Sequence, residues 1–197
     1  MISHHSLDIK QNNLLYGPGK RAVLFTQGCG LKCPGCNNQH LWKREEGKPL
    51  YTRQITELCA DSDIDGITLH GGEPTEQAEE LLPAVKEIKD MGKNVILFTG
   101  RKVEQLATPA QRELADISDI VKYGPYIEAE QDLYLHFRGS KNQKVCINPK
   151  GALKNYEIQD GTNTVLLTVN EDGSITVNGM PDAEMYKLLE EYTQGNS

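Results

Sequence analysis

The stretch "AVLFTQGCGLKCPGCNN", Ala22 to Asn38, joins a short apolar run to a loop that holds three of the five cysteines of the chain. The run Ala22–Gln27 is rich in β-prone residues and predicts a buried strand. Cys29, Cys33 and Cys36 follow that strand directly, with the spacing C-x3-C-x2-C. Three thiols at a strand end suit a disulfide framework, a zinc site or an iron-sulfur cluster, and each alternative implies a different kind of protein.

Disulfides are the least favoured of these alternatives. A chain of 197 residues can bury an apolar core without covalent cross-links. Its first residues, "MISHHSLDIKQNN", are polar, and no apolar run approaches the roughly 20 residues of a membrane span. We therefore expect a soluble, cytoplasmic protein in a reducing compartment, where clustered cysteines are metal ligands or redox groups more often than disulfides.

The charge balance bears on possible partners. The formal net charge is -7. Proteins that bind nucleic acids rely on lysine and arginine to neutralise phosphates, so this composition argues against a nucleic-acid partner. A protein partner or a small ligand remains compatible with it.

Strand-like and helix-like segments alternate along the chain. This order predicts βα units around a parallel sheet, which places the fold in the α/β class. Ligands bind at the carboxyl ends of such strands, where the cysteine loop, "GGEP" and the "TG" turn all fall, so one site is expected to contain all three. Pro83 and Pro109 are expected to interrupt their helices. The predicted strands are 22–27, 66–70, 94–98 and 119–124, and the predicted helices are 52–63, 75–91 and 103–115.

The tail differs in kind from this pattern. "TVLLTVNEDGSITVNG" contains two β-rich runs joined by "NEDG", which predicts a hairpin, and "PDAEMYKLLEEY" has apolar residues at helical spacing. We expect a core domain over residues 1–150 and a hairpin-plus-helix extension over residues 151–197.

The cysteine spacing alone favours a cluster modestly over zinc. Three thiolates can bind three irons of a 4Fe-4S cube and leave the fourth iron open to a substrate or cofactor. Zinc needs a fourth ligand, for which His40 is the candidate, but the second ligand pair usual in structural zinc sites is missing. A zinc-binding or electron-transfer module without catalytic activity stays open on this ground.

A second motif, "HGGEP" from His70 to Pro74, lies at the end of the second predicted strand. Paired glycines let a ligand approach the backbone closely, and Glu73 adds a carboxylate suited to an ammonium group. The ordinary explanation is a glycine turn that closes a βα unit.

Taken together, the motifs resemble the radical S-adenosylmethionine superfamily, and most closely the activating enzymes of anaerobic ribonucleotide reductases. Five features match in order over roughly residues 12–148: "YGPGKR", "LFTQGCGLKCPGCNN", "GGEP", "FTGRKVEQL", and "GPYIE" leading to "FRGSKNQ". Gly35 stands where many superfamily members have an aromatic residue, although "CPGC" is similar to the activase group. The resemblance implies a partial (βα) barrel, and the tail from about Thr162 lies outside it.

The resemblance also implies cofactors and ligands. Cys29, Cys33 and Cys36 would hold a 4Fe-4S cluster whose fourth iron is chelated by S-adenosylmethionine. One electron from the cluster would cleave the sulfonium to methionine and a 5′-deoxyadenosyl radical. The methionine ammonium would be received by Gly71, Gly72 and Glu73, and the adenosine would lie near Asn38, Thr99 and Gly100.

In the activase family the radical takes a hydrogen from a glycine Cα of a large glycyl-radical enzyme subunit, and a flavodoxin or ferredoxin type of protein supplies the electron. A radical S-adenosylmethionine enzyme that modifies a peptide or a small molecule is the alternative, with the tail as its recognition element.

Some further residues are expected to have ordinary roles. Cys59 and Cys146 are expected to be small buried side chains, and His136 a surface imidazole. Trp42 is expected to pack as a lid over the cysteine loop. Arg138, in "FRGSKNQ", is available for a carboxylate.

Overall fold

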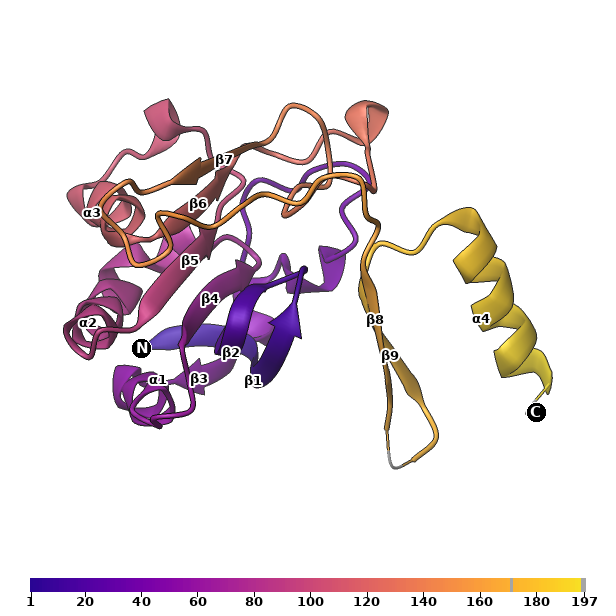
Figure 1. The fold of residues 1–197 in the computed structure, drawn as a ribbon, viewed down its shortest axis with the longest axis horizontal. Coiled ribbons are helices and arrows are strands. Elements are labelled where there is room, and N and C mark those ends of the chain that lie inside the picture. Colours follow the sequence, from indigo (N-terminus) through magenta and orange to yellow (C-terminus); the bar gives the residue numbers. More distant parts are fainter. Residues whose placement is uncertain (171, 196–197) are drawn as a thin grey trace.

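The computed structural model describes residues 1–170 and 172–195, and its centre is a seven-stranded sheet (Figure 1). The strand order is β3-β1-β2-β4-β5-β6-β7, in which β2, β4, β5 and β6 run parallel and the outer strands are antiparallel to their neighbours. The predicted α/β class is therefore confirmed. The strands of this sheet are β1 (Ile2–Asn13), β2 (Gly17–Thr26), β3 (Lys48–Leu50), β4 (Gly66–Gly71), β5 (Asn94–Phe98), β6 (Ile120–Tyr123) and β7 (Lys144–Ile147).

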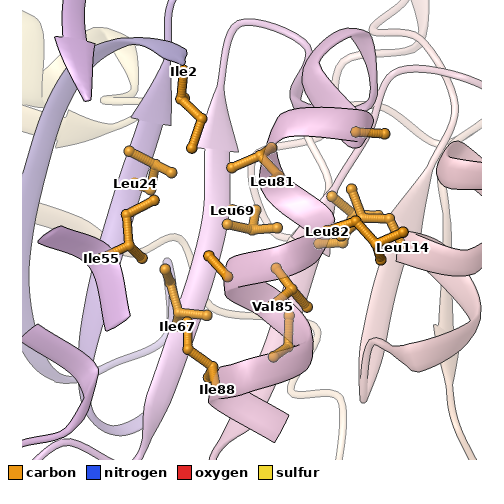
Figure 2. Close-up of a cluster of buried hydrophobic side chains, with 14 of the residues drawn as sticks. Ile2, Leu24, Ile55, Ile67, Leu69, Leu81, Leu82, Val85, Ile88 and Leu114 are labelled. Atoms are coloured by element: carbon orange, nitrogen blue, oxygen red, sulfur yellow. The ribbon is translucent and has the colours of Figure 1, made fainter. Parts of the chain in front are cut away.

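Three helices cover one face of the sheet, and their apolar side chains form the main core with it (Figure 2). Leu24, Ile67 and Leu69 point from the strands toward this layer and are completely buried. None of the described helices has the length and apolar composition needed to cross a membrane. The helices are α1 (Thr52–Cys59), α2 (Ala78–Asp90) and α3 (Pro109–Ile117), with short 3-10 turns at 39–41, 44–46, 74–77, 103–105 and 128–130.

Of the two prolines expected to interrupt helices, Pro109 does so and Pro83 does not: the predicted helix 103–115 is a 3-10 turn at 103–105 followed by a separate helix from Pro109. Pro109 is the first residue of α3, where its fixed φ suits a helix start, and the Thr108 hydroxyl caps the turn by accepting from the Gln111 N–H at 3.2 Å. Pro83 lies inside α2 without ending it.

The opposite face of the sheet carries a smaller core and the candidate site. Side chains alternate along a strand, so the neighbours of the helix-facing residues point to this second face. Ile96, Phe98 and Ile120 pack there against Phe137 and the segment that returns over the sheet after β7.

The tail forms the predicted hairpin and helix beside the main sheet (Figure 1). The hairpin is held to the body by the Tyr16 hydroxyl, which donates to Asn178 Oδ1 at 2.8 Å. The elements are β8 (Val165–Val169), β9 (Ile175–Gly179) and α4 (Ala183–Gly195). The division into domains at residue 150 stays a prediction.

The polar N-terminus, over which the sequence predicted no strand, contains one. Residues Ile2–Asn13 form β1, which pairs antiparallel with β2 over nearly its whole length. Only Ile2–His4 also pair with β3, so the rest of the other edge of β1 faces no strand of the sheet and tolerates polar residues.

Candidate active site

The cysteine loop begins at the carboxyl end of β2 and is fixed at its base by backbone hydrogen bonds. The Gly28 N–H donates to the Leu41 carbonyl at 2.8 Å, and the Cys29 N–H donates to the Trp42 carbonyl at 3.1 Å. Lys32 and Gly35 adopt positive φ values of 47° and 70°, which turn the chain twice between the cysteines. The loop is therefore sharply bent and not extended.

The three loop thiols are free and partly exposed. The Asn38 N–H lies 3.4 Å from Cys36 Sγ, and N–H groups of Leu31 and Lys32 point at Cys29. Burial raises the pKa of Cys29, and those two N–H groups oppose the rise by stabilising the thiolate. Hydrogen bonds of this kind also tune iron-sulfur clusters.

The donor set fits a cluster better than a single metal ion. Among the described residues, no group of three or more histidine, cysteine, aspartate or glutamate side chains converges tightly enough to hold one ion. In a 4Fe-4S cube each thiolate binds an iron of its own, so the sulfurs need not meet at one point. The zinc alternative, with His40 as fourth ligand, gains no support from this arrangement.

Glu73 joins the three loops at this edge of the sheet. Its carboxylate is completely buried. Oε1 accepts from the N–H of Thr75 at 3.0 Å and from the hydroxyls of Thr75 and Thr99 at 2.6 and 2.8 Å, and Oε2 accepts from the Gly100 N–H at 2.8 Å. The Glu73 N–H donates to the Gly28 carbonyl at 2.8 Å. The cysteine loop, "GGEP" and "TG" thus form one connected unit, as the strand-end argument predicts.

The two glycines before Glu73 allow this close approach. Gly71 has a φ of 102°, and a Cβ at Gly72 would overlap the Gly28 carbonyl oxygen. The ordinary explanation of "GGEP" as a tight turn is therefore correct as far as packing goes. It leaves the backbone groups of the turn beside the cysteine loop.

A cavity of about 530 Å³ adjoins this unit on the face of the sheet opposite the helices. Cys36 and Asn38 contribute to its wall, and a row of strand residues forms its floor. Asn178, Met180 and Tyr186 close one side, so the C-terminal extension shapes the cavity. The floor consists of Phe25, His70, Phe98 and Lys122, of which Phe25 pairs with His70 and Phe98 with Lys122 in the sheet register.

Two residues of this floor, His70 and Lys122, were given no role by the sequence analysis. The rings of His70 and Phe98 lie 4.6 Å apart, and burial, with a smaller contribution from Lys122, lowers the pKa of His70 to about 3, so the imidazole is neutral. Lys122 lies above the Phe98 ring, with 5.9 Å from Nζ to the ring centroid. The pairing of the strands, which the sequence does not show, puts both residues on the cavity face.

The "FRGSKNQ" segment stabilises the wall of the cavity through hydrogen bonds to other parts of the chain. The Gln143 amide donates to the Gly124 carbonyl at 2.9 Å, while its oxygen accepts from the Gly139 N–H at 2.7 Å. Arg138 binds both carboxylate oxygens of Asp160, at 2.7 and 2.5 Å, so the carboxylate that it contacts belongs to the same chain.

Two expectations for single residues are wrong, and one is confirmed. His136 is only 5% exposed, because its Nδ1 accepts from the Gln159 N–H at 2.9 Å and its ring packs against Phe137. Cys146 is exposed on β7, since that strand presents one edge and one face to solvent. Cys59 is completely buried, as expected.

Comparison with known proteins agrees with this geometry. A family model described as a 4Fe-4S single cluster domain matches residues 15–146. Three relatives carry the name anaerobic ribonucleoside-triphosphate reductase-activating protein. The one from Salmonella typhimurium is 32% identical over 142 residues, and the one from Escherichia coli K12 is 34% identical over 142 residues. Each match covers 68% of this chain and 92% of the relative.

The third relative comes from Enterobacteria phage T4 and is 34% identical over 145 residues, which are 70% of this chain and 90% of the relative. The family model includes the cysteine loop, Glu73 and the cavity floor, whereas β8, β9 and α4 lie beyond its last residue. With a 4Fe-4S domain over two thirds of its length and relatives matched over nine tenths of theirs, the chain belongs to the family of anaerobic ribonucleoside-triphosphate reductase-activating proteins.

Proposed function

We propose that this chain is a radical S-adenosylmethionine enzyme that installs a glycyl radical on an anaerobic ribonucleotide reductase. The observation that carries the proposal is the joining of the cysteine loop, "GGEP" and "TG" through the buried Glu73 carboxylate, beside a cavity that Cys36 lines. The helices on one face of the sheet and the cavity on the other support a fold of the partial-barrel type expected for this superfamily.

Cys29, Cys33 and Cys36 would hold the 4Fe-4S cluster and leave one iron for the amino and carboxylate groups of S-adenosylmethionine. When bound and reduced, the cluster would supply the electron for reductive cleavage of S-adenosylmethionine, the chemistry that would allow a hydrogen to be taken from a glycine Cα of the partner. The protein supplies orientation and shielding around this chemistry.

The residues of the second motif have distinct parts in this proposal. Gly71 and Gly72 present backbone groups beside the cysteine loop, where the methionine ammonium would be received. Glu73 was also predicted to receive the ammonium, but both of its oxygens are engaged by Thr75, Thr99 and Gly100. We assign to Glu73 the task of holding the glycine turn and the Thr99–Gly100 turn in register, with Asn38 in the cavity wall near the adenosine.

The partner would be the large reductase subunit, and a flavodoxin or ferredoxin type of protein in the same cytoplasmic compartment would supply the electron. The exposed thiol-bearing loop and the cavity open beside it give both partners access to the cluster. Tyr186 and Asn178 of the extension border that opening.

Anaerobic reconstitution tests the proposal. The protein is loaded with iron and sulfide, reduced with dithionite and given S-adenosylmethionine, and 5′-deoxyadenosine is quantified by chromatography. We expect cleavage that depends on the reductant, and its absence in a protein with a full cluster would overturn the enzymatic claim.

The partner claim has a separate test. Incubation with a large anaerobic ribonucleotide reductase subunit from the same organism is expected to produce a glycyl radical signal by electron paramagnetic resonance. Cleavage without that signal, and a precursor peptide gene in place of a reductase gene, would instead favour the enzyme class that modifies peptides.

A further inference from the structure

Lys122 stands out among the residues that line the cavity because it is a cation in an otherwise apolar floor. It lies near the carboxyl end of β6 and pairs in register with Phe98, which lies beside His70. This row places its side chain on the cavity face of the sheet.

No internal partner neutralises this cation. Over residues 1–170 and 172–195, Lys122 Nζ makes no ion pair and no hydrogen bond with a protein group, and it lies over the Phe98 ring. Lys89, in the last turn of α2, is by contrast bound to Asp119 at 2.6 Å. Lys122 is partly buried, and removing a cation from water without an internal partner is costly, so its presence at the cavity points to an anionic group there.

The charges around Lys122 identify that group. Cys36 lines the same cavity as Lys122. Burial lowers the pKa of Lys122 to about 8, and the charges of Glu73, Cys33, Cys36 and Cys29 oppose that fall. Glu73 is already saturated by four hydrogen bonds from its own chain. The three thiolates are therefore the anionic groups left to face the ammonium.

We propose that Lys122 sets the reduction potential of the 4Fe-4S cluster, by stabilising the reduced state through the charge of its ammonium group. The inference rests on the proposed function in requiring a cluster at Cys29, Cys33 and Cys36. Reduction adds one electron, supplied by the low-potential donor, to a centre that three thiolates already make negative. A fixed positive charge nearby favours that state over the oxidised one.

The medium makes this effect substantial. The ammonium lies over the Phe98 ring and near the neutral His70, and it shares the cavity lining with Cys36, so bulk water screens it less than it screens an exposed lysine. Across a partly buried path a unit charge changes an equilibrium by about tenfold or more. A tenfold change in the reduction equilibrium corresponds to about 59 mV for a one-electron couple.

A redox titration of the reconstituted full chain, followed by electron paramagnetic resonance without S-adenosylmethionine or reductase, tests the inference. The variants are Lys122→Met, Lys122→Gln and the charge-retaining Lys122→Arg. The matched control is Lys86→Met, which removes a lysine of α2 in the helix layer on the other face of the sheet. Lys122→Gln keeps the test decisive if methionine prevents cluster assembly.

We expect the neutral variants to lower the reduction equilibrium constant by about tenfold, whereas Lys122→Arg and Lys86→Met stay near the original value. An unchanged potential in a neutral variant would overturn the inference, and so would an equal fall in Lys122→Arg, because the loss would then be structural. A wild-type chain that takes up no cluster would instead refute the proposed function.

Discussion

Polar groups at the two ends of the parallel strands, here called the amino edge and the carboxyl edge of the sheet, differ in how they are paired. At the amino edge the buried Arg21 donates from Nε to the Thr68 hydroxyl at 2.8 Å and from Nη2 to Asn94 Oδ1 at 2.9 Å. Asp119, also completely buried, accepts from Lys89 at 2.6 Å and from the Val95 N–H at 2.7 Å. Both of these buried charges therefore have partners within the protein.

The carboxyl edge leaves several polar groups without one. Among the described residues, the buried side-chain nitrogens without a hydrogen-bond partner are Trp42 Nε1, Arg101 Nε and Asn178 Nδ2, from the cysteine-loop exit, the turn after "TG" and the cavity wall. The three loop thiols and Lys122 lie in the same region. Because a buried polar group without a partner is costly, the difference indicates that the amino edge serves stability and the carboxyl edge serves binding.

The largest effect is expected from removing a thiol at the carboxyl edge. Cys33→Ala should abolish cluster assembly and S-adenosylmethionine cleavage while circular dichroism shows a folded chain, because two thiolates cannot hold the cube. Iron content and the visible absorption of the reconstituted protein measure this. The matched control, Cys146→Ala on the exposed part of β7, should keep both, and turnover retained in Cys33→Ala would refute the ligand assignment.

At the amino edge a single change should cost stability and nothing else. Asp119→Asn leaves Lys89 without its carboxylate and sets an amide among N–H donors, so we expect a loss of about 3 kcal/mol in the free energy of unfolding. Urea denaturation checks this, with the exposed Asp116→Asn as control. A change in cluster potential in Asp119→Asn would contradict the separation of the two edges.

Glu73 links stability to binding, so its replacement should affect both. In Glu73→Gln the amide oxygen can serve the three donors that now reach Oε1, but the new NH2 group faces the Gly100 N–H, which loses its acceptor. We expect about 2 kcal/mol less stability and weaker S-adenosylmethionine binding by equilibrium dialysis. The exposed Glu79→Gln serves as control, and an unaltered affinity in Glu73→Gln would show that the Thr99–Gly100 turn does not contact the ligand.

The smallest effect is expected from breaking the ion pair between Arg138 and Asp160. Hydrogen bonding to Arg138 holds the pKa of Asp160 below its ordinary value of 3.8. The stabilisation is therefore complete above that ordinary value and is lost as the pH falls through the depressed one. Since Asp160 is nearly half exposed and screened by solvent, Arg138→Gln should cost less than about 1 kcal/mol at pH 7.

Urea denaturation of Arg138→Gln and the original chain at pH 7 and at pH 3 measures this difference, with the exposed Lys141→Gln as control. A penalty that grows toward acid pH would be inconsistent with the assigned ion pair.

The contrast between the edges also explains how much the sequence can predict. Continuous apolar runs such as "AVLF" and "NVILF" identify the parallel strands because they are buried on both faces, and the loops after them follow from chain direction. The strand β1 escapes prediction because its polar residues lie along an edge that is paired only at Ile2–His4.

The residues missed at the site share one cause. Lys122 in "DIVKYG" resembles any solvent-facing strand lysine, and its place beside the cavity follows only from the register of β6 on β5. His136 is buried because the segment around Gln159 packs against it, and no local sequence pattern predicts that contact. Glu73 is recognisable as part of a motif, yet the orientation of its carboxylate toward Thr99 depends on the neighbouring strand.

The proposed function depends above all on three loop thiolates that hold a cluster with one iron open to S-adenosylmethionine. The most direct test adds S-adenosylmethionine to the reduced, reconstituted chain and compares the electron paramagnetic resonance spectrum of the cluster before and after. We predict a changed spectrum in the original chain, because new ligands reach the open iron, and no cluster signal in Cys33→Ala. A full cluster whose spectrum is unaffected by saturating S-adenosylmethionine would contradict the claim.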